Sequence, residues 1–302
     1  MDTKMRPRGV RHFTFGQLML YFVLTLFALA CLLPMVLVVI ASLSTEASIL
    51  EKGFSFFPTE WTLDGYRYIS TFGDQIIRAY GVTLFETVVG SLWTVFICSM
   101  FGYVLSRKTF RLRKFLTVFL LITMLFRGGG LSEFIIKSNY YQLRNNLLVL
   151  ILPGVGAYTC FVMRTFIQSN VHESLIESAK LDGAGEFYIY TRIVLPLIKP
   201  VLAALGFMEA IGHWNQWQTS LLYMSNPKLA SLQQILMKIQ NSMDYFKQNM
   251  SLSSELAKVW ATLPKTSTKM AIVVVTSGPI IIAYPFFQKY FIKGITIGSV
   301  KG

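Results

Sequence analysis

Charged side chains are scarce in this sequence. Only 14% of the 302 residues are Asp, Glu, Lys or Arg, whereas 53% are hydrophobic. A soluble domain carries about 25% charged residues, so this balance excludes an ordinary soluble fold and predicts an all-α integral membrane protein. Acids are the scarcer sign, with 15 Asp and Glu against 28 Lys and Arg. The basic residues stand at the ends of apolar runs, which is typical of membrane topology and not of nucleic-acid binding.

Cysteine and catalytic motifs are scarce as well. The three cysteines, Cys31, Cys98 and Cys160, each lie inside an apolar run without metal-ligand spacing. We therefore expect packing residues and no disulfide framework. The apolar runs contain no HExxH pair, no GxGD-like acid pair and no serine–lysine pair, which disfavours an intramembrane enzyme. There is no Walker A motif either, so any ATP hydrolysis must come from another chain.

Six apolar runs approach the length of about 20 residues that a membrane-spanning helix needs. They cover residues 18–42, 80–105, 115–126 with an extension to 136, 146–166, 197–224 and 270–292. The first run is too long for the core of a signal peptide. The basic cluster at 107–114 contains no acid and marks the cytosolic side. Six spans then divide the chain into a cytosolic arm (1–17), one membrane domain (18–293) and a cytosolic tail (294–302).

Several runs contain helix breakers. Residues 127–130 read Arg-Gly-Gly-Gly and predict a broken helix or re-entrant turn in the third run, because glycine forms helix poorly. A phosphate-binding loop is rejected because no GKS or GKT follows. Pro153 interrupts the fourth run, and Pro279 and Pro285 lie in the sixth, where bending could be absorbed.

An amphipathic segment at residues 170–196 separates the fourth run from the fifth, on the cytosolic side. Asn170 is expected to cap its first helix, with Glu173 as the reciprocal partner. The apolar face of this helix is predicted to hold Val171, Leu175, Ile176 and Ala179. Gly183 should end the helix in a left-handed turn. A second helix is expected from about 184 to 195, before Pro196. Such a helix, turn and helix suits a groove on another protein.

This segment resembles the EAA motif of ABC importer permeases, in which it couples the permease to an ATPase. The residues that carry the resemblance are Glu177, Ser178, Ala179, Asp182, Gly183, Ala184, Ile193, Val194, Leu195 and Pro196. Ser178 replaces the usual alanine, a substitution of one small residue for another. The resemblance implies that Glu177 and Asp182 order the turn and contact the ATPase.

The fifth run contains polar and aromatic residues that are unusual inside a membrane. They are Glu209, His213, Trp214, Asn215, Trp217 and Gln218. Glu209 and His213 are four residues apart and share a helix face with Gln216 one further step along. An acid at this depth is costly and is a functional candidate. Two interpretations stay open: a sugar-contacting stripe, or a polar pair packed against a partner subunit. A metal site is disfavoured because no third ligand is in reach.

A wider resemblance extends over residues 15–302 to a subgroup of MalG-type carbohydrate permeases, related to permeases for lipoprotein-dependent and complex polysaccharide uptake. It rests on sequence at 126–131, 150–154, 163–166, 212–217 and 293–302. Ser132 and Glu133 depart from a Pro-Thr-like pair, and Glu209 is atypical, so neither transfers a sugar identity. The resemblance implies a type I importer fold with six helices, a second homologous permease, two ATPase subunits and an extracytoplasmic binding protein in a bacterial cytoplasmic membrane. This chain would bind no cofactor, and the ATPase would bind Mg-ATP.

The predicted outer segments are basic. Residues 225–266 carry Lys228, Lys238, Lys247, Lys258 and Lys265, and residues 127–144 carry Arg127, Lys137 and Arg144. Positive charge outside opposes the topological bias. One hypothesis is that it steers an acidic oligosaccharide or an acidic binding protein; the other is a solvated loop surface. The remaining alternative function is an ion-coupled carrier, for which repeated halves and transport without nucleotide are expected.

Overall fold

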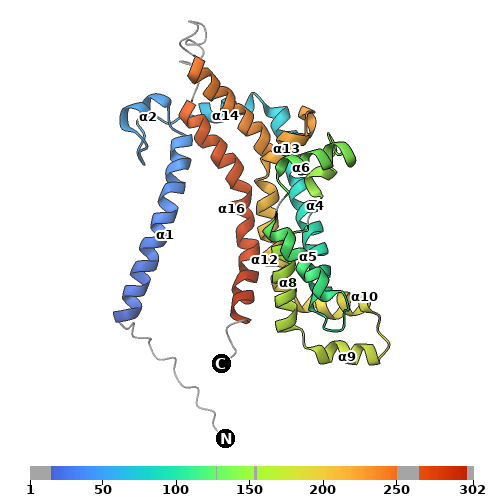
Figure 1. The fold of residues 1–302 in the computed structure, drawn as a ribbon. Coiled ribbons are helices and arrows are strands. Elements are labelled where there is room, and N and C mark those ends of the chain that lie inside the picture. The colour runs from blue at the N-terminus through green and yellow to red at the C-terminus, as the bar shows by residue number, and fades with distance from the viewer. Residues whose placement is uncertain (1–14, 127, 153–154, 250–264, 298–302) are drawn as a thin grey trace. The chain divides into compact units, whose positions relative to one another are not determined.

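The computed structural model describes residues 15–126, 128–152, 155–249 and 265–297 (Figure 1). The chain divides into two compact units, one made of residues 1–69 with 263–274 and the other of residues 70–262 with 275–302. The described part is helical and contains no β-strand beyond an isolated bridge between Ser44 and Trp61. The all-α prediction is therefore confirmed.

The first unit contains α1 (Phe15–Ser42), α2 (Glu46–Lys52), α3 (Asp64–Ser70) and the first turns of α16 (Lys265–Ile297). The Glu46 carboxylate accepts hydrogen bonds from the backbone N–H and the hydroxyl of Thr266, both at 2.8 Å. An acid at this position satisfies the otherwise unpaired Thr266 N–H at the start of α16. Gly65 lets the chain approach this helix closely, because a Cβ there would lie 2.9 Å from the Ser267 backbone.

The second unit is built around α4 (Gly73–Ser106), which packs against α8 (Ala157–Asn170) and α12 (Lys199–Trp214). Its other long helices are α5 (Arg113–Leu125), α14 (Leu232–Asn249) and the remainder of α16. The short elements are α6 (Gly130–Ile135), η1 (Ile136–Tyr140), α7 (Leu148–Ile151), α9 (Glu173–Leu181), α10 (Glu186–Ile189), η2 (Tyr190–Val194), α11 (Leu195–Leu197), α13 (Trp217–Tyr223) and η3 (Pro227–Leu229). In Figure 1, α9 and α10 lie at one end of this unit, and α6 and α13 lie at the other.

Helix α4 carries its polar residues inward and its apolar residues outward. Thr83, Glu86, Gly90, Thr94 and Cys98 recur every three or four residues and are all buried. The opposite face exposes large apolar side chains, among them Leu84, Val88, Leu92 and Phe96. A lipid-facing surface requires apolar side chains, so polar groups are confined to the side that faces other helices. We call the buried row Thr83–Cys98 the polar seam of α4.

The membrane-spanning runs match the helices in part. Three helices, Phe15–Ser42, Gly73–Ser106 and Lys265–Gln288, are long and apolar enough to cross a membrane, and two bent pairs raise the number to five among the described residues. The predicted break in the third run is present, because Arg113–Leu125 and Gly130–Tyr140 meet at 111°. The fourth run is represented by α7 and α8, with Pro153 outside the described residues. Helix α16 continues through Pro279 and Pro285.

Two other boundaries differ from the sequence-based expectation. The fifth run is not one helix, because α12 ends at Trp214 and α13 begins at Trp217. The predicted outer loop at 225–266 contains the 18-residue helix α14. The backbone N–H of Leu232, at the start of α14, donates a hydrogen bond of 2.9 Å to the Thr83 hydroxyl in the polar seam. Contacts with α4 therefore order part of a segment whose polar composition indicated a loop.

Candidate coupling surface and substrate pocket

The coupling segment, residues 170–196, begins differently from the prediction. Asn170 is the last residue of α8, and its side-chain N–H donates to the Phe166 carbonyl at 2.9 Å. His172 occupies the N-cap position of α9 without a side-chain hydrogen bond, so the predicted Asn170 cap is wrong. Helix α8 extends through Asn170, so this residue does not cap α9. Glu173 instead pairs with Lys108, with 3.1 Å between Nζ and Oε2.

The turn after α9 has the predicted glycine geometry. Gly183 has φ +83°, in the left-handed region. The N–H of Ala184 donates to the Ala179 carbonyl at 2.9 Å, and the N–H of Gly183 donates to the Lys180 carbonyl at 3.0 Å. These are the two hydrogen bonds of a Schellman motif, with glycine where an L side chain would be strained. The turn is therefore a fixed local structure.

The second half of the coupling segment does not end before Pro196. The π-helical turn η2 precedes α11, which includes Pro196. Proline has no N–H to donate, and the π-helical turn before it is a local change in the backbone hydrogen-bonding pattern. The chain bends at Ile198 instead, where Glu186–Leu197 and Lys199–Trp214 meet at 82°.

One face of the coupling segment is anchored and the other is exposed. Val171, Ile176, Ile189, Tyr190 and Val194 are buried in one cluster with residues of α4, α8 and α12. The Tyr190 hydroxyl lies 2.6 Å from the Ser99 hydroxyl in α4. Ala179, Ala184, Ile193 and Leu195 are partly buried against the same cluster. Leu175, predicted on the buried face, is exposed.

The exposed face is the part available to a partner. Glu177, Ser178, Asp182, Gly183 and Pro196 are exposed. Leu181 is 90% exposed, and Phe187 is also exposed. Apolar side chains that protrude beside acids and a rigid turn suit insertion into a groove on another protein.

Glu186 joins the turn to α4. Its carboxylate pairs with Lys180 and accepts a hydrogen bond from the Tyr103 hydroxyl. Partial burial raises the pKa of Glu186. The hydrogen bonds from Lys180 and Tyr103 lower this pKa by more than burial raises it, so the net shift is downward. The turn is therefore tied to the helix bundle by a charge-assisted contact.

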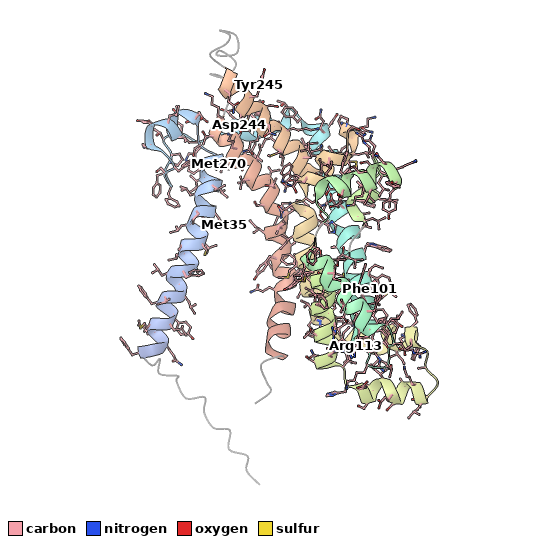
Figure 2. The ribbon with its side chains drawn as sticks, in the orientation of Figure 1. Met35, Phe101, Arg113, Asp244, Tyr245 and Met270 are labelled. Carbon is pink, nitrogen blue, oxygen red and sulfur yellow. The ribbon has the colours of Figure 1, made fainter. Side chains whose placement is uncertain are left out.

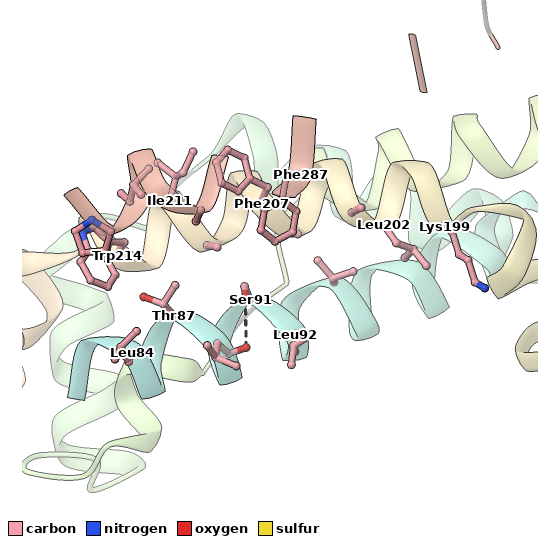
Figure 3. A pocket seen from close by; sticks show the side chains of 18 residues that line it. Leu84, Thr87, Ser91, Leu92, Lys199, Leu202, Phe207, Ile211, Trp214 and Phe287 are labelled. Carbon is pink, nitrogen blue, oxygen red and sulfur yellow. Dashed lines mark hydrogen bonds between the residues drawn. The ribbon is translucent and has the colours of Figure 1, made fainter. Parts of the chain in front are cut away.

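The polar residues of the fifth run face two different cavities. Glu209 and His213, together with Gln216, line a polar pocket of about 370 Å³. Trp214 lines an apolar cavity of about 590 Å³ between α4, α12 and α16 (Figure 3). Its indole N–H donates to the Thr276 carbonyl at 2.8 Å. The Asn215 side chain donates to the Ile211 carbonyl at the end of α12, and neither cavity is lined by Asn215, Trp217 or Gln218.

The polar pocket contains charged residues that the sequence did not bring together. Lys137 is 11% exposed and pairs with Glu133, with 2.6 Å between Nζ and Oε1. Lys137 was predicted as an outer surface charge, but its side chain is buried and lines this pocket. Glu209 accepts a hydrogen bond of 2.7 Å from the Thr159 hydroxyl in α8. Figure 2 shows the side chains of these helices in the same orientation as Figure 1.

Glu86 is a further charged residue that the sequence analysis did not single out. It is 0% exposed and lies in the polar seam of α4, with Oε1 3.9 Å from His213 Nδ1. The rule that drew attention to Glu209, an acid far inside an apolar run, applies equally to Glu86 and could have identified it. No group of three or more metal-binding side chains occurs within the described ranges.

The comparisons with known proteins agree with this architecture. A family model described as "Binding-protein-dependent transport system inner membrane component" matches residues 10–297, so the chain belongs to this family of ABC importer permeases. It is thus a multi-pass membrane subunit of a transporter and not an enzyme. Importers of this family combine such a permease with a partner permease, an ATPase and a binding protein.

Several relatives and one solved structure are similar over nearly the whole chain. YtcP of Bacillus subtilis (strain 168), named a polygalacturonan/rhamnogalacturonan transport system permease protein, is 35% identical over 287 residues, covering 95% of this chain and 98% of the relative. Protein LplC of the same strain is 33% identical over 272 residues, covering 90% of each. A bacterial ABC transporter involved in the import of the acidic polysaccharide alginate matches with TM-score 0.74 and 25% identity, covering 93% of this chain and 100% of the matched chain.

Proposed function

We propose that this permease subunit imports acidic oligosaccharides that an extracytoplasmic binding protein delivers. The observation that carries the proposal is the likeness to YtcP, which is named for polygalacturonan and rhamnogalacturonan, two polysaccharides that contain the acidic sugar galacturonate. The likeness to an importer of the acidic polysaccharide alginate supports the same substrate class. The complete importer would contain a second homologous permease and two ATPase subunits, which bind Mg-ATP. The chain would lie in a bacterial cytoplasmic membrane with both termini in the cytosol.

Basic side chains on two predicted outer segments support an acidic substrate. The Asn145 side chain accepts hydrogen bonds of 2.9 Å from the backbone N–H groups of Ser225 and Asn226, which joins the two segments. Arg144 and Lys228 flank this junction and are both exposed. Exposed charges of one sign raise the local concentration of an oppositely charged ligand, and salt screens the effect. Lys247 and Lys258, which were also predicted there, have side chains outside the described residues.

The coupling segment supports the route by which ATP drives transport. Its Schellman turn is rigid, its buried face is packed into the same cluster as α4, α8 and α12, and its other face is exposed. Closure of the ATPase dimer would push on Glu177, Asp182 and the turn, and the segment would carry the movement into α12. The paired permeases would then alternate between inward-facing and outward-facing states, and the sugar would pass Glu209 and His213 in the polar pocket.

The test is uptake by the complete importer in proteoliposomes. Trigalacturonate and its methyl ester share their ring hydroxyl groups but differ in charge, so they form a matched pair of substrates. We expect ATP-dependent, vanadate-sensitive uptake, faster for the free acid at low salt. The double variant Arg144→Gln/Lys228→Gln should slow uptake of the acid several-fold at low salt and leave the ester unchanged. Equal uptake of acid and ester before and after neutralisation would refute the acidic substrate, and uptake without ATP would refute the importer mechanism.

A further inference from the structure

Glu86 is a buried acid that the proposed transport mechanism leaves without a role. Neither of its carboxylate oxygens has a hydrogen-bond partner among the described residues, and the same holds for His213 Nδ1. Glu86 Oε1 lies 3.9 Å from His213 Nδ1, which is beyond hydrogen-bonding distance but within reach after a small movement of either side chain. An unpaired carboxylate inside a helix bundle is strongly unfavourable, so this residue type at this place requires a partner.

Gly90 leaves space for the His213 ring to pack against α4. A Cβ atom at Gly90 would lie 2.7 Å from His213 Cε1 and 2.8 Å from Nε2, so only glycine leaves room for the imidazole. Glu86 and Gly90 are one helical turn apart in the polar seam of α4. Helix α4 therefore offers both a space for the ring and a carboxylate for its nitrogen.

The pocket in front of His213 is rich in both donors and acceptors, and its charges are mostly compensated. Lys137 pairs with Glu133, and His213 faces Glu86 from the other side. Glu209, one turn before His213 on α12, accepts a hydrogen bond from the neutral Thr159 hydroxyl. The Thr94 hydroxyl, which also lines the pocket, has no partner in the described part of the chain.

We infer that Glu86 is a positioning residue for His213, and that the pocket binds the ring hydroxyl groups of a sugar and not its carboxylate. Hydroxyl groups both donate and accept, so one can donate to Glu209 while a neighbour accepts from His213. A substrate carboxylate only accepts hydrogen bonds, so it cannot donate one to Glu209 as a hydroxyl group does. This inference rests on the proposal that the chain conducts oligosaccharides. The pocket would recognise the hydroxyl groups of the sugar, whereas the basic residues of the outer segments would attract its negative charge.

The transport test compares Glu86→Gln, His213→Gln and the double variant in the complete importer. We expect each single variant to raise KM for the methyl ester and for the free acid about tenfold, the effect of losing about one hydrogen bond between His213 and a substrate hydroxyl, with little change in maximal rate. Because Glu86 acts through His213, the double variant should be no worse than His213→Gln alone. Asp74→Asn, which changes an exposed acid on the same helix, is the matched control. Additive losses, or a loss confined to the free acid, would overturn the inference.

A second measurement does not depend on any substrate. The chain has three histidines, so ¹⁵N-histidine labelling of the assembled importer gives few imidazole signals, and His213→Gln assigns the one of interest. We expect Glu86→Gln to shift the His213 ring nitrogens and to leave exposed His172 unchanged. Gly90→Ala should do the same by displacing the ring, whereas Gly81→Ala, on the same helix with open space around it, should not. A His213 signal that is unaffected by both Glu86→Gln and Gly90→Ala would refute the positioning role, even if the importer proves to carry a different substrate.

Discussion

The coupling segment and the polar pocket lie in the same unit but are constructed in different ways. The turn at Gly183 is held by hydrogen bonds between residues at most five apart, from Ala179 to Ala184. The pocket takes its charged residues from three elements: Glu133 in α6 and Lys137 in the adjoining η1, and Glu209 in α12, which is distant from both in sequence. Behind it, Glu86 belongs to a fourth element, α4. A local turn can tolerate changes elsewhere in the bundle, whereas the pocket depends on how closely the helices approach.

The largest effect should come from breaking the helix contacts on which the pocket depends. Gly102→Ala places a Cβ 2.6 Å from Met163 Cβ and 3.0 Å from the Arg164 backbone nitrogen, so α4 and α8 must separate. Overpacking of this kind costs about 1–3 kcal/mol, and backbone atoms cannot move aside as a side chain would. We expect a fall in the thermal unfolding midpoint of the importer and loss of uptake.

Gly81→Ala is the matched control for this change. It lies on the same helix with no atom within 4 Å of the added Cβ, so it should be neutral or slightly stabilising. Equal unfolding midpoints for the two alanine variants would show that α4 and α8 are not in contact at Gly102. The comparison would then lose its basis, because the pocket would not depend on close helix packing.

The same contrast explains what the sequence could predict. Glycine after an amphipathic helix predicts a left-handed turn from local chemistry alone, and Gly183 confirms it. Hydropathy likewise located the apolar runs. Hydropathy could not show that the Lys137 side chain is buried beside Glu133. In the sequence, an acid and a base four residues apart form the same pattern whether the ion pair faces solvent or a pocket. Nor could hydropathy pair Glu86 with His213, which are more than a hundred residues apart and meet only through helix packing.

Tertiary contacts prevailed over residue preference at one predicted cap, and they also decide where a tryptophan of the fifth run lies. Asn170 is a good N-cap residue, but α8 continues through it and the cap position falls on His172. A sugar-contacting stripe that includes Trp214 and Trp217 was one of the two interpretations left open for the fifth run, and it stays a hypothesis. Helical geometry turns Trp214 toward α16, where its N–H finds the Thr276 carbonyl. A buried indole usually occupies such a hydrogen-bonded position, and only the fold shows which one is available.

A smaller loss of stability with a specific loss of function should follow from changing the turn. Gly183→Ala forces an L side chain into φ +83°, at a cost of about 1–2 kcal/mol, although no atom lies within 4 Å of the new Cβ. We expect reduced coupling between ATPase activity and uptake in the reconstituted importer, and a stronger defect for Gly183→Val. Gly185→Ala, two residues away with φ −72°, is the control and should retain coupling. Full sugar-stimulated ATPase activity and uptake in Gly183→Val would remove the turn from the coupling mechanism.

The smallest effect should be a pH-dependent one at Glu186, which connects the turn to α4. Because the pKa of this carboxyl is lowered in the folded protein, its contribution to stability is fully present above the unfolded pKa of about 4.3 and is lost as the pH falls through the folded value. Glu186→Gln should therefore lower the unfolding midpoint at pH 7 by an amount worth less than about 1 kcal/mol, because the group is largely exposed. The difference from the wild type should narrow below about pH 4. Glu177→Gln, an exposed acid on α9, controls for removal of one charge and should change the midpoint little at either pH. A difference between Glu186→Gln and the wild type that stayed constant down to pH 4 and below would mean that the Glu186 carboxylate does not stabilise the junction through its charge.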